Sequence, residues 1–571
     1  MTALLTDNLP LLAGAPNGIK KLRELILELA VRGKLVEQDA SDEPASELLK
    51  RIAADKARLV VEGKIKKQKP LEEISEEELP YSAPSAWEWV RLDALLTKIG
   101  AGSTPLGGKQ AYVNEGVKFL RSQNVWNEGL YLDDVAMISE ATHQKMQGTH
   151  VGAGDLLFNI TGASIGRCAV VPDDFDTGNV SQHVTIIRPL AKDLKRFLHM
   201  VLISPLLQQT VMDVQVGVSR EGLSIGKLAQ FVIPFPPQAE QHRIVAKVDE
   251  LMALCDRLET QQADATSAHA QLVQALLGSL TQAGAATEFA ANWQRLAEHF
   301  HTLFSTEPSI DALKQALLQL AVMGKLVPQD PSDEPASELL KCIQAEKHRL
   351  VAEGKMKKPK PAVEITDEEL SFELPSGWCL ARLETIAQVG TGATPLRSNP
   401  KYFSPGTINW ITSGETSQDY ISETEQKVSP LALTETNLTV YPPHTLIIAM
   451  YGQGKTRGQI AELLISACTN QACAAIELLD QDHSHRWYVK YFFIKSYDDI
   501  RSLAAGGAQP NLNVGKIKDT VIPLPPLAEQ HRIVAKLDQL MALCDQLKTQ
   551  LSQARQLNQQ LASTLVEQAV A

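Results

Sequence analysis

The chain has 571 residues, which is too long for one ordinary domain and predicts about four units of roughly 150 residues each. Hydrophobic residues make up 44% of the chain and charged residues 21%, which is typical of globular protein and excludes a disordered or fibrous class. The formal net charge of −12 argues against a generally basic protein that coats nucleic acid without specificity.

The N-terminus and the cysteines indicate an intracellular chain. Residues 1–12 lack the basic start and the long apolar run of a signal peptide, and no apolar stretch is long enough to span a bilayer. The seven cysteines form no Cys-x-x-Cys pair, and the histidines and cysteines show no zinc spacing. We therefore expect a cytoplasmic protein with free thiols, no metal site and no membrane partner.

Two helices are predicted in the N-terminal helical region, residues 1–90. Apolar residues from Ile19 to Leu29 share one helical face, and Gly33 suits a left-handed C-terminal cap. Pro44 fits the first turn of a second helix, which ends near Gly63.

The same signals return in the second half of the chain. The segment Ser41–Lys50 recurs letter for letter as Ser332–Lys341, and Ala239–Lys247 recurs as Ala528–Lys536. The spacing between the copies far exceeds the ~20–50 residues of solenoid repeats, so the chain is a duplicated multi-part unit. The predicted regions are the N-terminal helices at 1–90, a variable block at 91–235, a central helical region at 236–378, a second variable block at 379–524 and a C-terminal helix at 525–571.

Each copy ends in a long helix with a heptad pattern. Apolar residues follow each Pro-Pro pair at alternating steps of four and three, which defines a coiled-coil seam. The seam positions are Ile244, Val248, Leu251, Cys255 and Leu258 in the first helix, and Ile533, Leu537, Leu540, Cys544 and Leu547 in the second. The pattern continues through Leu272 and Leu561. Because the obvious partner of each helix is its own copy, we expect an antiparallel coiled coil that acts as a spacer. The alternative is that each helix packs on its own domain.

The two variable blocks are predicted to be compact α/β modules. Short apolar runs such as Asp155–Phe158 and Thr445–Ala449 lie between glycine-rich turns, and one helix follows them. The expected fold class is therefore mixed α+β. It is an internal duplication in which two globular α/β domains are separated by repeated helical regions.

Several turns in these blocks carry side chains suited to base edges. Arg and Lys can read guanine, Asn and Gln can read adenine, and Glu can accept from cytosine. The candidates in the first block are Arg121, Gln123, Asn124, Asn159, Thr161, Ser164, Arg167, Ser181, Gln182 and Arg220. Those in the second block are Thr412, Ser413, Glu415, Tyr451, Gln453, Lys455, Arg457, Asn470, Gln471 and Gln509. A polar group that only satisfies its own turn is the more common explanation for any single residue. The clustering of the candidates is what indicates a DNA surface.

Four kinds of motif stand out along the chain. They are Pro-Pro-x-Ala-Glu-Gln-His-Arg-Ile-Val-Ala-Lys at 236–247 and 525–536, Gly154–Gly166, Tyr451–Gly458 with Asn470-Gln471, and the Gly-x-Thr-Pro turns at 102–105 and 392–395. Together, these motifs resemble those of the specificity subunit of type I restriction-modification systems over nearly the whole chain. The long N-terminal helical extension, repeated in the centre, is similar to the subgroup with larger specificity subunits.

The resemblance implies that each block is a target recognition domain, which reads one half of an interrupted, asymmetric site in double-stranded DNA. It implies that the helices set the spacing and dock two modification subunits, which methylate adenine with S-adenosylmethionine. It further implies that restriction subunits join that core and cleave DNA with ATP and Mg²⁺. This chain is then expected to hold no cofactor and no catalytic residue.

Three motifs could instead indicate catalysis. Gly452–Thr456 is similar to a phosphate-binding loop, but Ala449 stands where the full pattern needs a glycine. Asn399–Tyr402 resembles the Asn-Pro-Pro-Tyr motif of amino-methyltransferases, with Lys401 in place of the second proline. Pro172–Asp174 could open a nuclease motif, but no convincing Glu-x-Lys follows. The alternatives are therefore a stand-alone methyltransferase or nucleotide-binding enzyme, and a coiled-coil scaffold whose blocks bind proteins.

Overall fold

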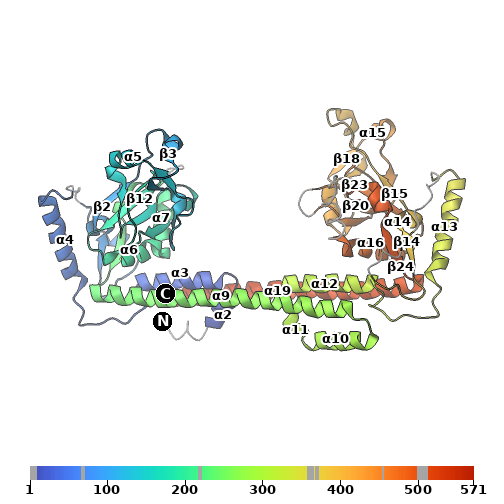
Figure 1. Ribbon diagram of the computed structural model, residues 1–571, viewed down its shortest axis with the longest axis horizontal. Helices are drawn as coiled ribbons and strands as arrows, with labels where there is room; N and C mark the ends of the chain where they lie inside the picture. Colours follow the sequence, from blue (N-terminus) through green and yellow to red (C-terminus); the bar gives the residue numbers. More distant parts are fainter. Residues whose placement is uncertain are drawn as a thin grey trace. The chain divides into compact units, whose positions relative to one another are not determined.

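The computed structural model describes residues 9–65, 71–216, 222–356, 365–366, 369, 372–452, 456–497 and 512–570. The chain divides into two compact units. Unit 1 comprises Met1–Ala265 with Ala554–Ala571, and unit 2 comprises Thr266–Gln553. Figure 1 labels the elements of both units.

Unit 1 begins with a short helix that was not predicted, followed by the two predicted helices. They are α2 (Leu9–Gly14), α3 (Gly18–Val31) and α4 (Ala45–Val61). Gly33 has a φ of 69° and Gly63 a φ of 68°, so both occupy the left-handed region just after a helix, as predicted. Pro44 is the N-cap of α4 rather than a residue of its first turn.

Unit 2 repeats this arrangement with an addition. Its helices are α10 (Ala286–Glu298), α11 (Phe300–Leu303), α12 (Glu307–Val322) and α13 (Ala336–Ala352). The pair α12 and α13 corresponds to α3 and α4, and Gly324 ends α12 with a φ of 68°. In unit 1, α3 lies along a long helix, and in unit 2, α12 does the same (Figure 1). Arg23 of α3 pairs with Asp256 at 2.7 Å, and Lys314 of α12 pairs with Asp545 at 2.5 Å.

The two long helices are α9 (Gln238–Gln282) and α19 (Leu527–Val570). The unit boundary falls inside both, so each unit holds the first part of one helix and the last part of the other. In unit 1, Leu251 and Cys255 share a hydrophobic core with Ala562. In unit 2, Leu277 shares a core with Leu537. This arrangement confirms the predicted antiparallel coiled coil, and all ten predicted seam residues from Ile244 to Leu258 and from Ile533 to Leu547 are buried or half-buried.

The continuation of the seam was predicted one residue out of place. Leu272 and Leu561 are 52% and 48% exposed, whereas Val273 and Ala562 beside them are 2% and 1% exposed. A strict seven-residue repeat drifts by about 20° per heptad on a straight helix. Over about four heptads this drift approaches the ~100° between neighbouring residues, so the buried face passes to the next position.

The first block is built from two sheets. One has the order β10-β9-β12-β2, and the other has the order β3-β7-β4-β11-β8. Their bounds are β2 (Leu96–Ala101), β3 (Tyr112–Val113), β4 (Val117–Leu120), β7 (Ala136–Ile138), β8 (His150–Val151), β9 (Leu156–Asn159), β10 (Cys168–Val170), β11 (Gly178–Val180) and β12 (Val184–Pro189). The hairpin β5 (Val125–Trp126) and β6 (Gly129–Leu130) is inserted after β4, and α6 (Leu194–Ile203) and α7 (Pro205–Val216) follow β12.

The second block has the same central strand order. Its sheets run β15-β23-β20-β21-β17 and β18-β16-β22-β19. Their bounds are β15 (Ala387–Thr391), β16 (Ile408–Ile411), β17 (Tyr420–Ile421), β18 (Gln426–Val428), β19 (Val440–Tyr441), β20 (Leu446–Ala449), β21 (Ile460–Leu463), β22 (Ala467–Thr469) and β23 (Cys473–Leu478), with α16 (His483–Lys495) after β23. The apolar runs at β9 and β20 are buried at every position, because each strand lies inside a sheet that is covered on both faces. These mixed α/β modules confirm the predicted fold class.

A short strand pair closes each block where the helices join it. β1 (Glu88–Arg91) pairs with β13 (Val232–Phe235), and β14 (Cys379–Arg382) pairs with β24 (Val521–Leu524). The registers correspond residue for residue. Among the described residues, no single helix is long and apolar enough to cross a membrane, although α6 and the first part of α7, bent by 58°, pass together by length and composition.

The repeated Ala-Glu-Gln-His-Arg motif is a joint between the helices and the block. Glu240 accepts hydrogen bonds from Trp87 Nε1 at 3.0 Å and from Gln38 Nε2 at 2.6 Å, and Arg243 pairs with Asp42 at 2.6 Å. In unit 2 the corresponding contacts are Trp378 to Glu529 at 2.9 Å, Gln329 to Glu529 at 2.6 Å and Arg532 to Asp333 at 2.5 Å. The repeated letters therefore record a repeated set of structural contacts.

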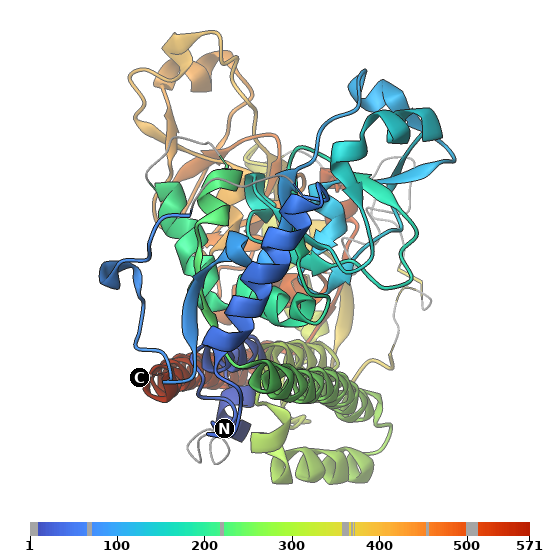
Figure 2. The same cartoon turned by 90° about the vertical axis from the view of Figure 1, so that its left-hand side faces the viewer.

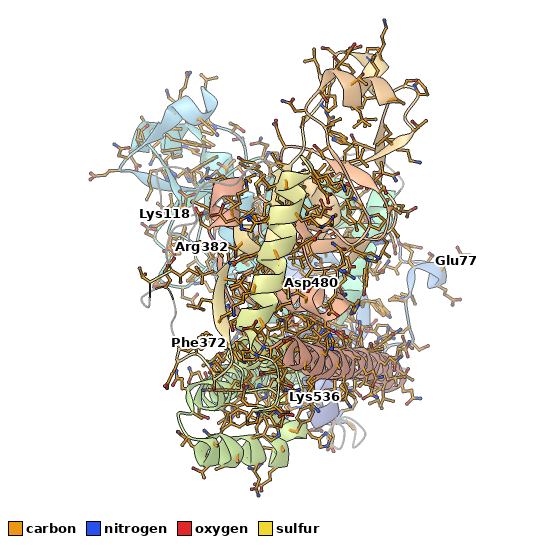
Figure 3. The ribbon with its side chains drawn as sticks, turned by 90° about the vertical axis from the view of Figure 1, so that its right-hand side faces the viewer. Glu77, Lys118, Phe372, Arg382, Asp480 and Lys536 are labelled. Atoms are coloured by element: carbon orange, nitrogen blue, oxygen red, sulfur yellow. The ribbon has the colours of Figure 1, made fainter. Side chains whose placement is uncertain are left out.

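A second repeated contact attaches α4 and α13 to their blocks. Figure 2 shows α4 beside the first block, where Lys56 donates to the backbone oxygen of Asp93. Figure 3 shows α13 in front of the second block with Arg382 labelled beside it, and Lys347 of α13 donates to the backbone oxygen of Glu384. Arg382 also pairs with Glu369 at 3.1 Å.

Replacing Glu240 by glutamine is expected to flatten the pH dependence of the stability of unit 1. Burial raises the pKa of Glu240 above its ordinary value of 4.5, although the hydrogen bonds from Trp87 and Gln38 oppose this. A carboxyl with a raised folded-state pKa contributes stability that is present below the unfolded-state pKa and is lost as pH rises through the folded-state pKa. Glutamine has no such titration and retains an oxygen that accepts from Trp87.

This expectation is tested by measuring the denaturant midpoints of wild type and Glu240→Gln at pH values between 4 and 8, in steps of about one pH unit. Glu250→Gln, a change at an exposed glutamate of the same helix, is the control and should follow the wild type. Parallel curves for Glu240→Gln and wild type would contradict the assignment.

Candidate nucleic-acid interface

Four turns meet at one edge of the first block. They are residues 102–106, 121–124, 160–164 and 181–183, which follow β2, β4, β9 and β11, and we call them the first turn cluster. Backbone hydrogen bonds hold the cluster together, from Ser181 N to Leu120 O at 2.9 Å and from Ile160 N to His183 O at 3.0 Å. Asn159 Nδ2 adds a bond to Ser122 O at 2.8 Å. The structure thus brings together candidates that are far apart in the sequence.

The same edge of the second block carries the same set of turns. Residues 392–396, 412–415, 450–452 and 470–472 follow β15, β16, β20 and β22, and we call them the second turn cluster. Asn470 N donates to Ile411 O at 2.9 Å and Met450 N to Ala472 O at 2.8 Å, which matches the first cluster bond for bond. The two clusters therefore present unlike side chains on a like backbone.

Glycine is required where the Gly-x-Thr-Pro turn closes on each cluster. A Cβ atom at Gly102 would lie 2.0 Å from Val180 O, and one at Gly392 would lie 1.6 Å from Thr469 O. Real Cβ atoms do not approach oxygen so closely. Both turns are therefore held against the neighbouring turn by direct backbone approach.

Several candidates of the first cluster are committed to their own turn. Asn124 is 2% exposed, accepts from Arg121 N at 2.9 Å and donates to Tyr131 O at 2.9 Å. Arg121 and Gln123 both donate to Asp134. Asn159 and Ser181 are buried. Asn159 Nδ2 donates to Ser164 Oγ at 3.2 Å. These contacts favour a supporting role for the residues concerned.

Other candidates of the first block reach its surface. Thr161 Oγ1 lies 2.6 Å from His183 Nδ1, and exposed Gln182 accepts from Thr104 Oγ1. Together they form a row of polar side chains across the first, third and fourth turns of the cluster. Arg220 lies outside the described residues.

Arg167 is placed by an aromatic ring that the sequence analysis did not single out. Its guanidinium carbon lies 3.6 Å from the centre of a Trp126 ring, and Trp126 Nε1 donates to Gln123 O at 2.8 Å. Within the described ranges, the Arg167 guanidinium donates to no protein acceptor, so its edge is available to a ligand. The sequence feature that could have revealed this contact is a tryptophan within a polar segment, because a large aromatic side chain there usually packs against a neighbouring side chain or a ligand.

The second cluster shows the same division between supporting and outward side chains. Glu415 caps its turn, accepting from Thr412 N at 2.6 Å and from Glu425 N at 3.1 Å. Asn470 Oδ1 accepts from Ala472 N at 2.9 Å. Gln471 and Tyr451 are exposed. Ser413 is half-buried, and its carbonyl oxygen accepts from Thr416 Oγ1. Arg457 is also half-buried. The remaining candidates, Gln453, Lys455 and Gln509, lie outside the described residues.

The motifs that could indicate catalysis have structural roles where they are described. Asn399 Oδ1 accepts from Lys401 N at 3.3 Å, as a cap, and Asp173 pairs with Lys195 at 2.6 Å. The central part of the loop similar to a phosphate-binding loop, residues 453–455, lies outside the described residues.

The thiols near the clusters are neutral, and the polar groups there are suited to hydrogen bonding. Burial raises the pKa of Cys473 to about 12 and raises the pKa of Cys168, so neither is a thiolate nucleophile at neutral pH. All seven cysteines are free, as predicted. In the part of the chain that the structure describes, no group of three or more His, Cys, Asp or Glu side chains could hold a metal ion. What the clusters offer is an array of hydrogen-bond donors and acceptors.

Comparison with known proteins assigns the chain to a family. The family model for the type I restriction modification DNA specificity domain matches residues 84–265 and 375–554. The chain is 38% identical over 582 residues to the type I restriction enzyme EcoAI specificity subunit of Escherichia coli, covering 97% of this chain and 94% of that protein. It is also 38% identical over 574 residues to the EcoEI specificity subunit of Escherichia coli, with the same coverage. A crystal structure of the HsdS subunit from Thermoanaerobacter tengcongensis aligns with 86% of this chain and 98% of that chain, at 18% identity and a TM-score of 0.43. By its two family domains and these full-length relatives, the chain belongs to the family of type I restriction-modification specificity subunits.

Proposed function

We propose that this chain selects the DNA sequence at which a type I restriction-modification complex acts, and that each block reads one half of a bipartite, asymmetric site. The observation that carries the proposal is the pair of turn clusters, in which corresponding backbone turns present unlike side chains. Contacts to phosphates position a protein on DNA, and contacts to base edges specify the sequence. One backbone frame with two sets of side chains fits a reader of two different half-sites.

The side chains of the first block best placed to read bases are Thr161 and Gln182 in the first turn cluster and Arg167 just after its third turn, because they reach the surface. Gln471 and Tyr451 have the corresponding position in the second cluster. Gln453, Lys455 and Arg457 extend this set by sequence position. The remaining candidates, among them Asn124 and Glu415, shape the turns that present these readers.

The helices are proposed to hold the blocks at a set spacing and to dock two modification subunits. Each unit carries leucines on its long helices that are exposed in the isolated chain, including Leu543 at 48% and Leu557 at 65%. Exposed apolar side chains along a helix are typical of a surface that a protein partner covers. Restriction subunits would join the complex formed in this way.

The chemistry is proposed to lie on the partner subunits, with S-adenosylmethionine on the modification subunits and ATP with Mg²⁺ on the restriction subunits. Methylation of adenine requires the base to leave the stack and enter an enzyme pocket. The described residues of the turn clusters offer hydrogen-bonding groups and neutral, buried thiols, which are suited to recognition. We propose that this non-catalytic chain works in the cytoplasm, on chromosomal and incoming DNA.

The test begins with the site itself, which mapping of methylated adenines in a genome that carries the system would reveal. The complex of this chain with its modification subunits is then titrated with a labelled cognate duplex and with competitors. We expect cognate DNA to compete at least about a thousand-fold better than random DNA of the same length. Equal competition by random duplexes would overturn the proposal.

Replacing Arg167 by alanine is expected to weaken cognate binding by about 5- to 150-fold and to relax one position of the first half-site. A bidentate base contact contributes roughly 1–3 kcal/mol of discrimination. Methylome sequencing of the variant gives the relaxed position. Trp126→Ala should relax the same position to a smaller extent, because the ring only positions the guanidinium. Uniform weakening on all sequences would assign Arg167 to a phosphate contact.

A further inference from the structure

An exposed leucine follows the Gly-x-Thr-Pro turn in both blocks. Leu106 is 101% exposed and Leu396 is 67% exposed, and each comes directly after a buried proline, Pro105 or Pro395. A single exposed leucine on a protein surface is ordinary. Two of them at corresponding positions in the two blocks point to a common cause.

The turns that carry these leucines are anchored firmly. The buried proline fixes one side of each turn, and the glycine at its start lies against Val180 O or Thr469 O so closely that no side chain would fit. In the first block Thr104 also donates to Gln182. A leucine on such a turn is held out into solvent by the fold and has little freedom to fold back.

A second observation marks the same edge as incomplete in the free chain. A buried hydroxyl lies at this edge of each block, Ser181 Oγ in the fourth turn of the first cluster and Thr469 Oγ1 at the end of β22, next to the second cluster. Neither has a hydrogen-bond partner among the described residues. Ser181 is 5% exposed and Thr469 is fully buried. Buried polar groups are nearly always paired, so an unpaired one indicates a place where another molecule or water completes the contact.

We propose that Leu106 and Leu396 are apolar DNA contacts, each pressing on the base pairs of the half-site that its own block reads. The proposal rests on the proposed function, because it takes the turn clusters to be the DNA-facing edge. Base pairs offer apolar surface to such a side chain, as the thymine methyl group in the major groove and as the faces of a step that a wedge opens in the minor groove. The phosphate groups of DNA offer none, so we expect the contact to depend on the bases.

The test is a coupling experiment with the complex of this chain and its modification subunits. Leu106→Ser and Leu396→Ser are titrated with four duplexes: the cognate site, the site with the first half randomised, the site with the second half randomised, and a fully random duplex. We expect each serine variant to lose about ten- to hundred-fold in affinity for the cognate duplex, as the loss of one buried leucine contact predicts. The loss for Leu106→Ser should disappear when the first half-site is randomised, and the loss for Leu396→Ser when the second is.

Leu464→Ser is the matched control. Leu464 is 45% exposed in the same block as Leu396 but follows the far end of β21, away from the second turn cluster, so its replacement should leave binding unchanged. The dependence of affinity on salt should be the same in all variants, because no charge is altered.

Three results would overturn the proposal. They are no loss in either leucine variant, an equal loss on cognate and random DNA, and failure of a variant to assemble with the modification subunits, which would assign the leucines to a protein contact. A failure of the proposed function would look different. In that case the wild-type complex itself would bind cognate and random duplexes equally.

Discussion

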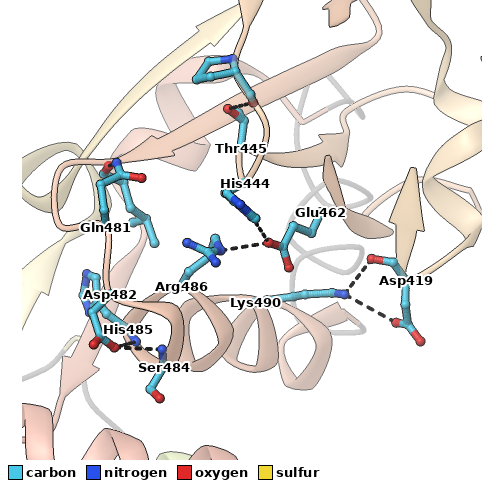
Figure 4. A network of polar contacts seen from close by, with 12 residues as sticks. Asp419, His444, Thr445, Glu462, Gln481, Asp482, Ser484, His485, Arg486 and Lys490 are labelled. Carbon is cyan, nitrogen blue, oxygen red and sulfur yellow. Dashed lines mark hydrogen bonds and ion pairs between the residues drawn. The ribbon is translucent and has the colours of Figure 1, made fainter. Parts of the chain in front are cut away.

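Replacing Glu462 by alanine is expected to destabilise unit 2 by about 3–5 kcal/mol, the cost of leaving a buried charge without its partner. Glu462 is 2% exposed and accepts from Arg486 Nε at 2.9 Å, with His444 Nδ1 also 2.9 Å away. Arg486 is 5% exposed, so its guanidinium would remain in the interior with no counter-charge at this position. Figure 4 shows Glu462 of β21 between His444, which precedes β20, and Arg486 of α16.

A second buried cation next to this pair makes the loss harder to absorb. Lys490 is fully buried, donates to Asp419 O at 2.7 Å and lies 4.1 Å from the centre of a Trp487 ring (Figure 4). Burial lowers the pKa of Lys490, while Asp419 and Glu462 oppose this. Removal of Glu462 therefore takes away a negative charge that both cations share.

Hydrogen exchange followed by mass spectrometry separates this effect from a general one, because it reports on each unit of the intact chain. Peptides from β21 and α16 should lose protection in Glu462→Ala, whereas peptides from β9 in unit 1 should not. Glu423→Ala, at an exposed glutamate of the same block, is the control. The double variant Glu462→Met with Arg486→Met should lose much less than Glu462→Ala, since apolar groups can replace a buried pair as a whole. A loss below about 1 kcal/mol in Glu462→Ala would mean that water reaches the arginine.

The duplicated frame could be predicted from the sequence because its signals are local and occur twice. Letter-for-letter repeats located the joint around Glu240 and Glu529, and heptad spacing located both long helices. The seam was right for its first turns and wrong by one residue at Leu272 and Leu561, where the geometry of a straight helix prevails over a strict count of seven.

The candidate site was predictable in its location but less so in its members. The turns were found because base-reading residue types cluster in them. Thr412 and Glu415, however, stand three residues apart, which is the spacing of a capping box, and the structure shows that box. Trp126 beneath Arg167 and the network around Glu462 had no spacing that could reveal them. Their members come from separate segments that only tertiary packing brings together.

The strongest expected change in function comes from building a chain with the first block in both places. Leu92–Phe231 would replace Leu383–Thr520, and the structure supplies the junctions. Leu92 N donates to Phe231 O at 2.9 Å, and Leu383 N donates to Thr520 O at 2.9 Å, immediately inside strand pairs of identical register. Arg196, which pairs with Asp249 of α9 at 2.9 Å, would find Asp538 at the corresponding place on α19.

We expect the complex made with this chain to methylate a site that contains the first half-site twice, and to lose the wild-type site by a factor on the order of 10³ or more. Methylome sequencing reads the new site directly. The two copies are expected to form an inverted repeat, because the two long helices of the duplication pair antiparallel, whereas a direct repeat would contradict this expectation. A methylated sequence that still contains the second half-site would show that residues outside 383–520 read it. That result would remove the basis for assigning one half-site to each turn cluster.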